Sequence, residues 1–207
     1  MNPFYYELIN YVMWAVTALL IFVRYKNQRD YWYLLIGWSL VFPLDYISDK
    51  YSLFLRYNEG FTMLFDRYPL FLLPAFGWFF ALPTILCLRF KNKIDALHLW
   101  RRVGILFVVF LALGFVAEIA STSSGYYAYY WPSTWMINGV VPLSIPITDS
   151  IYLVMLYFGH KVAIEYSVNK KWISGFLIHI GTYYVVFALG ILITWLFVWA
   201  LGIKPTW

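Results

Sequence analysis

Long apolar runs that recur along the whole chain are the feature that most restricts its fold. The 207 residues are 63% hydrophobic and only 12% charged, whereas a soluble domain is about 25% charged and rarely more than about 50% apolar. A water-soluble fold could not cover so many apolar side chains, and no stretch between the runs is long enough for a soluble domain. We therefore predict a single transmembrane domain over residues 1–207.

The length of each apolar run indicates how the domain is built. A helix that spans a bilayer needs about 20 apolar residues, and the prediction is an all-α, polytopic membrane helical bundle with about six transmembrane helices. The first run has neither a basic leader nor a cleavage site before it, so we interpret it as a retained helix. The predicted helices cover residues 5–24, 31–50, 69–90, 103–122, 136–158 and 173–201.

Basic residues indicate the orientation of these helices. The formal net charge is +5, but the basic side chains form short clusters between apolar runs, which is a topology signal and excludes a nucleic-acid-binding surface. By the positive-inside rule, the three clustered connections are cytoplasmic, while the connections 51–68 and 123–135 and both termini lie on the non-cytoplasmic side. The clusters are Arg24, Lys26 and Arg29; Arg89, Lys91, Lys93, Arg101 and Arg102; and Lys161, Lys170 and Lys171.

A weak internal repeat relates residues 73 positions apart. Each half contains an acid, a serine three residues later, an aromatic loop, and a Pro-Leu pair that opens the next helix. Because proline fits the first turn of a helix, both prolines are predicted helix starts. We interpret helices 2–3 and 4–5 as a duplicated hairpin. The pairs are Asp45 with Glu118, Ser48 with Ser121, Tyr57 with Tyr130, and Pro69-Leu70 with Pro142-Leu143.

Three acids, Asp45, Glu118 and Asp149, fall inside the predicted membrane helices. A charged side chain near the bilayer centre costs about 2.5 kcal/mol or more, so such residues usually face a bundle interior or a wet cavity. Their positions along the helices let all three reach one outward-opening pocket, and we predict them as catalytic residues. Apolar surroundings favour the protonated carboxyl group, which is a Brønsted acid. The alternative is that these acids only bind loop backbone near the interface.

Aromatic residues make up 23% of the chain, which is more than two interfacial belts require. Ring faces stabilise a cation within about 6 Å of the ring centroid without reacting with it. The surplus can therefore line a cavity for an isoprenoid. The predicted substrate-binding residues are Trp38, Trp78, Tyr127, Tyr130 and Tyr152.

Motifs for metals, phosphates and cofactors are missing from the sequence. It contains no DDxxD run, no glycine-rich phosphate loop, no HExxH and no GxSxG. His179 and Tyr183 lie one turn apart on the last predicted helix, but a histidine without a second ligand at suitable spacing indicates a hydrogen-bonded packing residue. We therefore predict no metal site, and acid–base chemistry that needs no cofactor.

The second predicted hairpin carries a family resemblance. Its sequence, from Glu118 to Asp149, is EIASTSSGYYAYYWPSTWMINGVVPLSIPITD. It resembles membrane carotenoid-modifying enzymes, namely the carotenoid hydratases of the bacterioruberin pathway and the small lycopene β-cyclases, in which an intramembrane acid precedes a Gly-aromatic loop and a Pro-Leu helix start. Its plan is also similar to that of the fungal integral-membrane meroterpenoid cyclases, which use paired acids.

The resemblance implies protonation of an alkene or epoxide in a lipid-soluble isoprenoid, with Glu118, Asp149 or Asp45 as the acid or the terminal base. The chain departs from the lycopene cyclases at one point. Their paired acids follow the proline directly, whereas Pro142 is followed by Leu143-Ser144, which leaves the identity of the acid open.

The leading hypothesis is a membrane-embedded terpene or carotenoid cyclase or hydratase in which a protonated carboxylic acid starts a carbocation. Its partners would be the isoprenoid substrate and membrane lipids. One alternative is a sterol-type double-bond isomerase, which needs a base on the opposite face of the substrate. Others are a non-catalytic lipophile transporter or binding protein, and a structural subunit whose acids contact partner helices.

Overall fold

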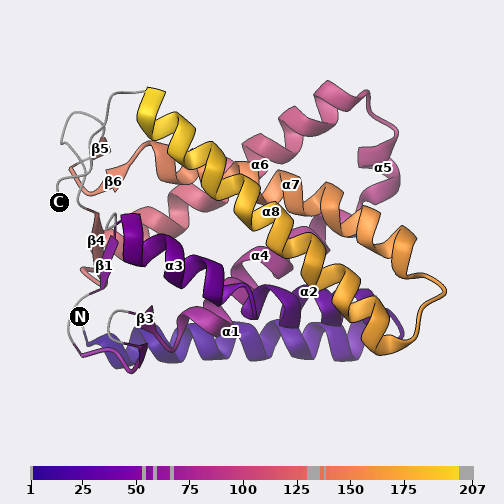
Figure 1. Ribbon diagram of the computed structural model, residues 1–207, viewed down its shortest axis with the longest axis horizontal. Coiled ribbons are helices and arrows are strands. Elements are labelled where there is room, and N and C mark those ends of the chain that lie inside the picture. The colour runs from indigo at the N-terminus through magenta and orange to yellow at the C-terminus, as the bar shows by residue number, and fades with distance from the viewer. Residues whose placement is uncertain are drawn as a thin grey trace.

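The computed structural model describes residues 2–52, 55–57, 60–65, 68–129, 136–137 and 139–200. These residues form an α-helical structure with short two-stranded ribbons gathered at one end (Figure 1). The helices are α1 (Pro3–Arg24), α2 (Arg29–Ser39), α3 (Phe42–Ser52), α4 (Leu72–Arg89), α5 (Lys91–Asp95), α6 (Leu99–Ser123), α7 (Ser144–Ser167) and α8 (Trp172–Ala200). The strands are β1 (Leu55–Tyr57), β2 (Met63–Phe65), β3 (Tyr68–Pro69), β4 (Tyr127–Tyr129), β5 (Met136–Ile137) and β6 (Val141–Pro142).

Within the described residues, four helices are long and apolar enough to cross a membrane: α1, α4, α6 and the Trp172–Leu196 part of α8. Large apolar side chains cover their outer faces, as at Phe22, Val116 and Leu177, which are 62%, 70% and 61% exposed. Such an apolar exterior suits contact with lipid. The prediction of an all-α fold with helices of membrane-spanning length is confirmed at this level.

The predicted helix over residues 31–50 is divided in the structure. Helix α2 closes at Leu40, whose N–H bonds to the carbonyls of Ile36 and Gly37, and α3 begins at Phe42. Pro43 follows directly, and proline lacks the N–H that a continuous helix would need and restricts the residue before it. The prediction of one unbroken helix is therefore wrong, and the break places Asp45 in the first turn of α3.

The two prolines predicted as helix starts lie in strands instead. Pro69 ends β3 and pairs with Met63, while Pro142 ends β6 and pairs with Met136. A proline is accepted at the edge of such a short ribbon because its missing N–H interrupts no further pairing. Helices α4 and α7 therefore begin only at Leu72 and Ser144, later than the predicted residues 69 and 136.

The two connections predicted as outward loops are joined by a strand ribbon. Strand β1 pairs antiparallel with β4, so that Tyr57 lies opposite Tyr127. The turn that leads from α6 into β4 contains Gly125 at φ 73°, a conformation that glycine adopts without the steric cost of a Cβ atom. The ribbon holds the ends of two hairpins together at the left of Figure 1.

The core between the helices is built around a tryptophan of α2 and the aromatic rings that pack against it. The indole of Trp38 is fully buried and stacks on Phe80 of α4 at 4.5 Å and on Tyr183 of α8 at 5.9 Å. Aromatic pairs of this kind contribute about 0.5–1.5 kcal/mol each beyond the burial of their area. Helices α2, α4 and α8 are thus held together by one aromatic stack.

An ionic cluster joins the helix ends opposite the ribbons. Asp95, the last residue of the short helix α5, accepts from Lys161 of α7 at 2.6 Å and lies 3.5 Å from Arg102 of α6. Helix α5 and the turn between α7 and α8 lie on the right of Figure 1, away from the strands. The basic connections therefore lie together, at the end away from the strands.

We predict that Gly77→Ala destabilises the protein by about 1–3 kcal/mol, because an added methyl group overpacks a filled interface. A Cβ atom at Gly77 would contact Ser39 Oγ and lie 2.8 Å from the Trp14 ring, where the indole donates to that hydroxyl at 3.0 Å. Thermal unfolding in detergent micelles measures the effect. Gly104→Ala is the control, since nothing lies within 4 Å of its Cβ position, and an equal loss in both variants would contradict the prediction.

Candidate active site

One cavity of about 570 Å³ opens near the strand end of the helices. Its wall takes residues from α1, α3, α4, α6, α7 and α8 and from strands β1 and β4. Most of the wall is apolar or aromatic, including Phe76, Phe79 and Phe80 of α4 and Phe187 of α8. The size lies within the range of about 300–1,000 Å³ that is usual for small-molecule sites.

All three predicted acids line this cavity. Asp45 comes from α3, Glu118 from α6 and Asp149 from α7. Asp149 is close enough to interact electrostatically with both of the other carboxyl groups. The structure thus brings together the three side chains that the sequence places on separate helices.

Glu118 is held by two tyrosines of the neighbouring strand. The hydroxyl groups of Tyr127 and Tyr129 donate to the same carboxylate oxygen, Oε2, at 3.1 and 2.7 Å. Alternate residues of a strand point to the same side, so β4 presents both phenols to one carboxyl group. Glu118 itself is 9% exposed, and the two donors compensate for the water it has lost.

Asp45 has a tyrosine partner in a different ribbon. The phenol of Tyr68, on β3, lies close to the carboxyl group. The Tyr68 ring is fully buried and packs against Phe42 and Tyr46 of α3 at 6.3 and 6.0 Å. A strand therefore places a phenol near the helix carboxyl group here too.

Asp149 differs from the other two acids. Among the residues that the structure describes, its carboxyl group has no hydrogen bond to another protein group. One turn further along α7, the ring of Tyr152 lines the cavity, and its hydroxyl lies near Thr194 of α8. Gly190 leaves room for this ring, because a Cβ atom there would collide with it.

The five predicted substrate-binding residues have different positions. Trp78, Tyr127 and Tyr152 line the cavity, and the Trp78 indole donates to Asn10 Oδ1 at 2.9 Å. Trp38 does not line it, because its ring is buried behind Phe80. Tyr130 lies outside the described residues.

Several residues of the wall carried no sequence signal. Tyr6 of α1 stacks on Tyr126 at 4.0 Å and hydrogen-bonds Ser121 Oγ at 2.9 Å, which joins α1 to the end of α6. Tyr129 was also missed, although the YAY spacing of β4 puts it on the same side as Tyr127.

In the part of the chain that is described, no group of three or more His, Cys, Asp or Glu residues is arranged to hold a metal ion.

Comparisons with protein-family models, curated proteins and solved structures gave no match. The resemblance of residues 118–149 to the carotenoid-modifying enzymes stays a prediction based on its motif.

We predict that the Tyr129 phenol and the Glu118 carboxyl group act as one unit. Tyr129→Phe should destabilise the protein by about 1–3 kcal/mol, because a buried acceptor loses its shortest hydrogen bond. In the double variant with Glu118→Gln the loss should be clearly smaller than the sum of the single losses. Chemical unfolding in micelles measures all three variants.

Tyr184→Phe is the matched control for this cycle, since that phenol donates to the Leu40 carbonyl at 2.9 Å, away from Glu118. Its effect should add to that of Glu118→Gln. Strict additivity for Tyr129→Phe as well would show that the two groups are not coupled.

Proposed function

We propose that the chain is an enzyme that protonates an alkene or epoxide of a lipid-soluble isoprenoid and thereby forms a cyclic or hydrated product. The observation that carries this proposal is the convergence of Asp45, Glu118 and Asp149 from three helices on one aromatic cavity. Carboxyl groups in an apolar site favour their protonated form, and neighbouring carboxyl groups cannot all ionise at low cost. At least one of the three is therefore available as an acid.

The apolar and aromatic composition of the cavity wall favours an apolar substrate. Aromatic rings from four helices, α1, α4, α7 and α8, surround the space. Ile9 of α1 and Ala120 of α6 line the cavity and are both exposed, Ile9 by 52%. This exposure supports entry of a substrate from the bilayer between these two helices, without passage through water.

We assign different roles to the three acids because their hydrogen bonds differ. Among the described residues, Asp149 has no hydrogen-bond donor, and a carboxyl group without donors keeps its proton and can give it to a substrate. Glu118 accepts hydrogen bonds from two phenols, an arrangement that stabilises a carboxylate. Asp149 is thus the proposed proton donor, and Glu118 the proposed terminal base.

The proposed reaction moves one proton through the cavity. The Asp149 O–H bond breaks, and its proton forms a C–H bond with one alkene carbon, while the other carbon becomes cationic. Ring faces of Trp78, Phe80 and Tyr152 stabilise the cation. An internal double bond attacks it to close a ring, or water adds to it, and the proton released passes to Glu118.

The same groups suit a double-bond isomerase, in which the cation loses a proton from a neighbouring carbon and no ring forms. Product analysis separates the two reactions. A lipophile transporter is the alternative from another class, favoured by a cavity that opens beside lipid-facing residues. Movement of an unchanged isoprenoid across sealed vesicles would identify it.

We further infer that the chain consists of two related halves. Strands β1 and β4 pair Leu55 with Tyr129 and Arg56 with Ala128. Under the 73-residue repeat, Leu55 is equivalent to Ala128, and Arg56 is equivalent to Tyr129. Replacing each residue by its equivalent therefore converts the Leu55–Tyr129 pair into the Arg56–Ala128 pair. An antiparallel ribbon with this register supports a two-fold relation between the hairpins that it joins.

The smaller ribbons support the same inference. Met63 pairs with Pro69 in one, and Met136 with Pro142 in the other, at positions again 73 residues apart. Asp45 and Glu118 are equivalent under this relation, whereas Asp149 corresponds to Phe76. The proposed proton donor is thus the acid that breaks the symmetry.

For the membrane arrangement, we propose six crossings by α1, α2 with α3, α4, α6, α7 and α8. Helix α1 begins and α8 ends at the strand end of the molecule (Figure 1). The basic connections lie at the opposite end, which would face the cytoplasm under the positive-inside rule. The termini and the cavity would then face the other side.

The catalytic proposal predicts that Asp149→Asn and Glu118→Gln each lower product formation by about 100-fold or more, the usual contribution of general acid–base catalysis. The variants are expressed in a host that accumulates isoprenoids, and lipid extracts are compared by mass spectrometry for isomers and water adducts. Asp45→Asn should also reduce turnover. Glu165→Gln, on the exposed side of α7, is the control, and wild-type product levels in all three acid variants would refute the proposal.

A second prediction concerns the protonated acid itself. Infrared spectra of the purified protein should contain the C=O stretch of a protonated carboxyl group, which Asp149→Asn removes and Glu165→Gln leaves in place. The band identifies the donor without any substrate. Its persistence in Asp149→Asn together with its loss in Glu118→Gln would reverse the two roles.

A further inference from the structure

The end of the helices away from the strands, which we call the basic end, carries a large excess of positive charge. Eleven of the fifteen lysine and arginine residues lie there, together with three of the ten acids. The reaction proposed above uses none of these groups. The basic residues are Arg24, Lys26, Arg29, Arg89, Lys91, Lys93, Arg101, Arg102, Lys161, Lys170 and Lys171, and the acids are Asp30, Asp95 and Glu165.

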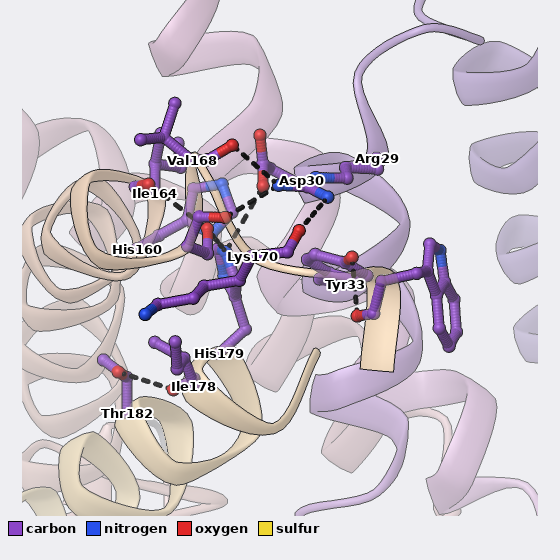
Figure 2. Close-up of polar contacts among 12 residues, drawn as sticks. Arg29, Asp30, Tyr33, His160, Ile164, Val168, Lys170, Ile178, His179 and Thr182 are labelled. Carbon is purple, nitrogen blue, oxygen red and sulfur yellow. Dashed lines mark hydrogen bonds and ion pairs between the residues drawn. The ribbon is translucent and has the colours of Figure 1, made fainter. Parts of the chain in front are cut away.

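Two of these charged side chains are engaged at the start of α2. Figure 2 shows the guanidinium group of Arg29 against backbone carbonyls at and just beyond the end of α7, to which it donates at 2.7–3.1 Å. The neighbouring Asp30 turns toward the buried ring of His179, with 3.4 Å between Oδ1 and Nε2. Both side chains therefore contact groups of the protein itself.

Asp95 engages two more cations. Its carboxylate lies 2.6 Å from Lys161 Nζ and 3.5 Å from Arg102 Nη1. Arg102 also donates to the backbone carbonyls of Asp95 and Leu97, and so ties down the turn between α5 and α6. Adjacent residues of a helix point about 100° apart, so Arg101 is directed away from Asp95.

Four cations around α5 are exposed instead. Arg89 ends α4, Lys91 and Lys93 belong to α5, and Arg101 lies in the first turn of α6. Among the described residues, none of these four side chains has a carboxylate within ion-pair distance. We call this surface, residues 89–101, the α5 corner. It lies on the right of Figure 1, where α5 and the beginning of α6 are found.

Apolar side chains lie between the cations of the α5 corner. Phe90 and Leu99 are exposed, and the Trp100 side chain, next to Arg101, is 75% exposed. Tryptophan is enriched where a membrane meets water, because its ring is apolar and its N–H is polar. The α5 corner therefore has the composition of a surface that lies at the level of lipid headgroups.

Helix α6 continues this surface with an apolar stripe. Ile105 and Val108 follow Arg101 by four and seven residues, so they lie on the same face of the helix, and both are exposed. Val116 extends the stripe along α6. A phospholipid has the same order along its length, a charged phosphate group followed by acyl chains.

We propose that the α5 corner binds an anionic phospholipid, with its phosphate group on Arg101 and an acyl chain along Ile105 and Val108. Arginine suits a phosphate because its planar group donates two parallel hydrogen bonds. Lysine and arginine residues clustered beside a membrane helix attract anionic lipids. An acidic protein segment would match the charges but not the apolar stripe that continues from them, so the observations favour a lipid. This site does not depend on the proposed reaction.

Lipid binding is tested by mass spectrometry of the intact full-length protein, released from micelles that contain equal amounts of phosphatidylglycerol and phosphatidylcholine. The wild-type protein should retain phosphatidylglycerol in preference. The double variant Lys93→Gln with Arg101→Gln should bind it about tenfold more weakly or worse, since each cation beside an anionic headgroup adds to the attraction. Equal retention of the two lipids by the wild-type protein would overturn the proposal without any variant.

The matched control is the double variant Arg24→Gln with Lys26→Gln. It removes the same two charges from exposed positions at the basic end, but at the other edge, because α1 ends at the lower right of Figure 1. This variant should keep the wild-type preference for phosphatidylglycerol. An equal loss in both double variants would show attraction by net charge alone and would overturn a site at the α5 corner.

Glycerol phosphate carries the phosphate group of the lipid without its acyl chains, and so separates a lipid from a free anion. An excess of it should leave phosphatidylglycerol bound to the wild-type protein, and displacement would overturn a lipid site. Thermal unfolding is an independent measurement, because a ligand of the folded state raises the melting temperature. Phosphatidylglycerol should raise it for the wild-type protein and the control variant but not for the variant of the α5 corner, and an equal rise in all three would contradict the proposal.

Discussion

A carboxyl group buried among apolar helices needs either hydrogen-bond donors or a proton of its own, and this requirement organises the strand end of the protein. Glu118 obtains two phenol donors from β4, and the Tyr68 phenol of β3 lies near Asp45. The ribbons are therefore part of the site, because they hold the tyrosines beside two of the buried acids, and those of β4 compensate Glu118 for its lost water. Asp149 has no such donor in the described part of the chain, and the proposed chemistry depends on that difference.

The helices could be predicted from the sequence because a bilayer admits few alternatives to a helix for a long apolar run. Helix α1 matches its predicted range at the C-terminal end, and α6 and α8 differ from theirs by a few residues. The division between α2 and α3 was missed although Pro43 signalled it, since the apolar run continues across the break. The strands were missed because β1 and β4 are far apart in the chain, and apolar periodicity contains no information about their pairing.

The three acids could be predicted as site residues because the free-energy cost of placing a carboxyl group in a membrane depends on residue type and position, which the sequence gives. Their tyrosine partners depend on strand register, so only Tyr127 was predicted, and Tyr68 and Tyr129 were not. His179 was predicted to be a packing residue with Tyr183 nearby on the same helix. His160 was not predicted, because the pattern of one helix cannot show which face of α7 meets α8.

An aromatic layer separates the cavity from a second polar cluster near the other end of the helices, formed by Asp30 of α2, His160 of α7, and His179 and Tyr183 of α8. Phe80 and Phe187 line the cavity on one side of this layer and contact Trp38 on the other, and Trp38 in turn stacks on Tyr183. Among the described residues, no hydrogen bond links Tyr183 to the three acids across the layer. Because no hydrogen-bonded path crosses it there, an acid that must keep its proton for a substrate is insulated from the basic end of the helices.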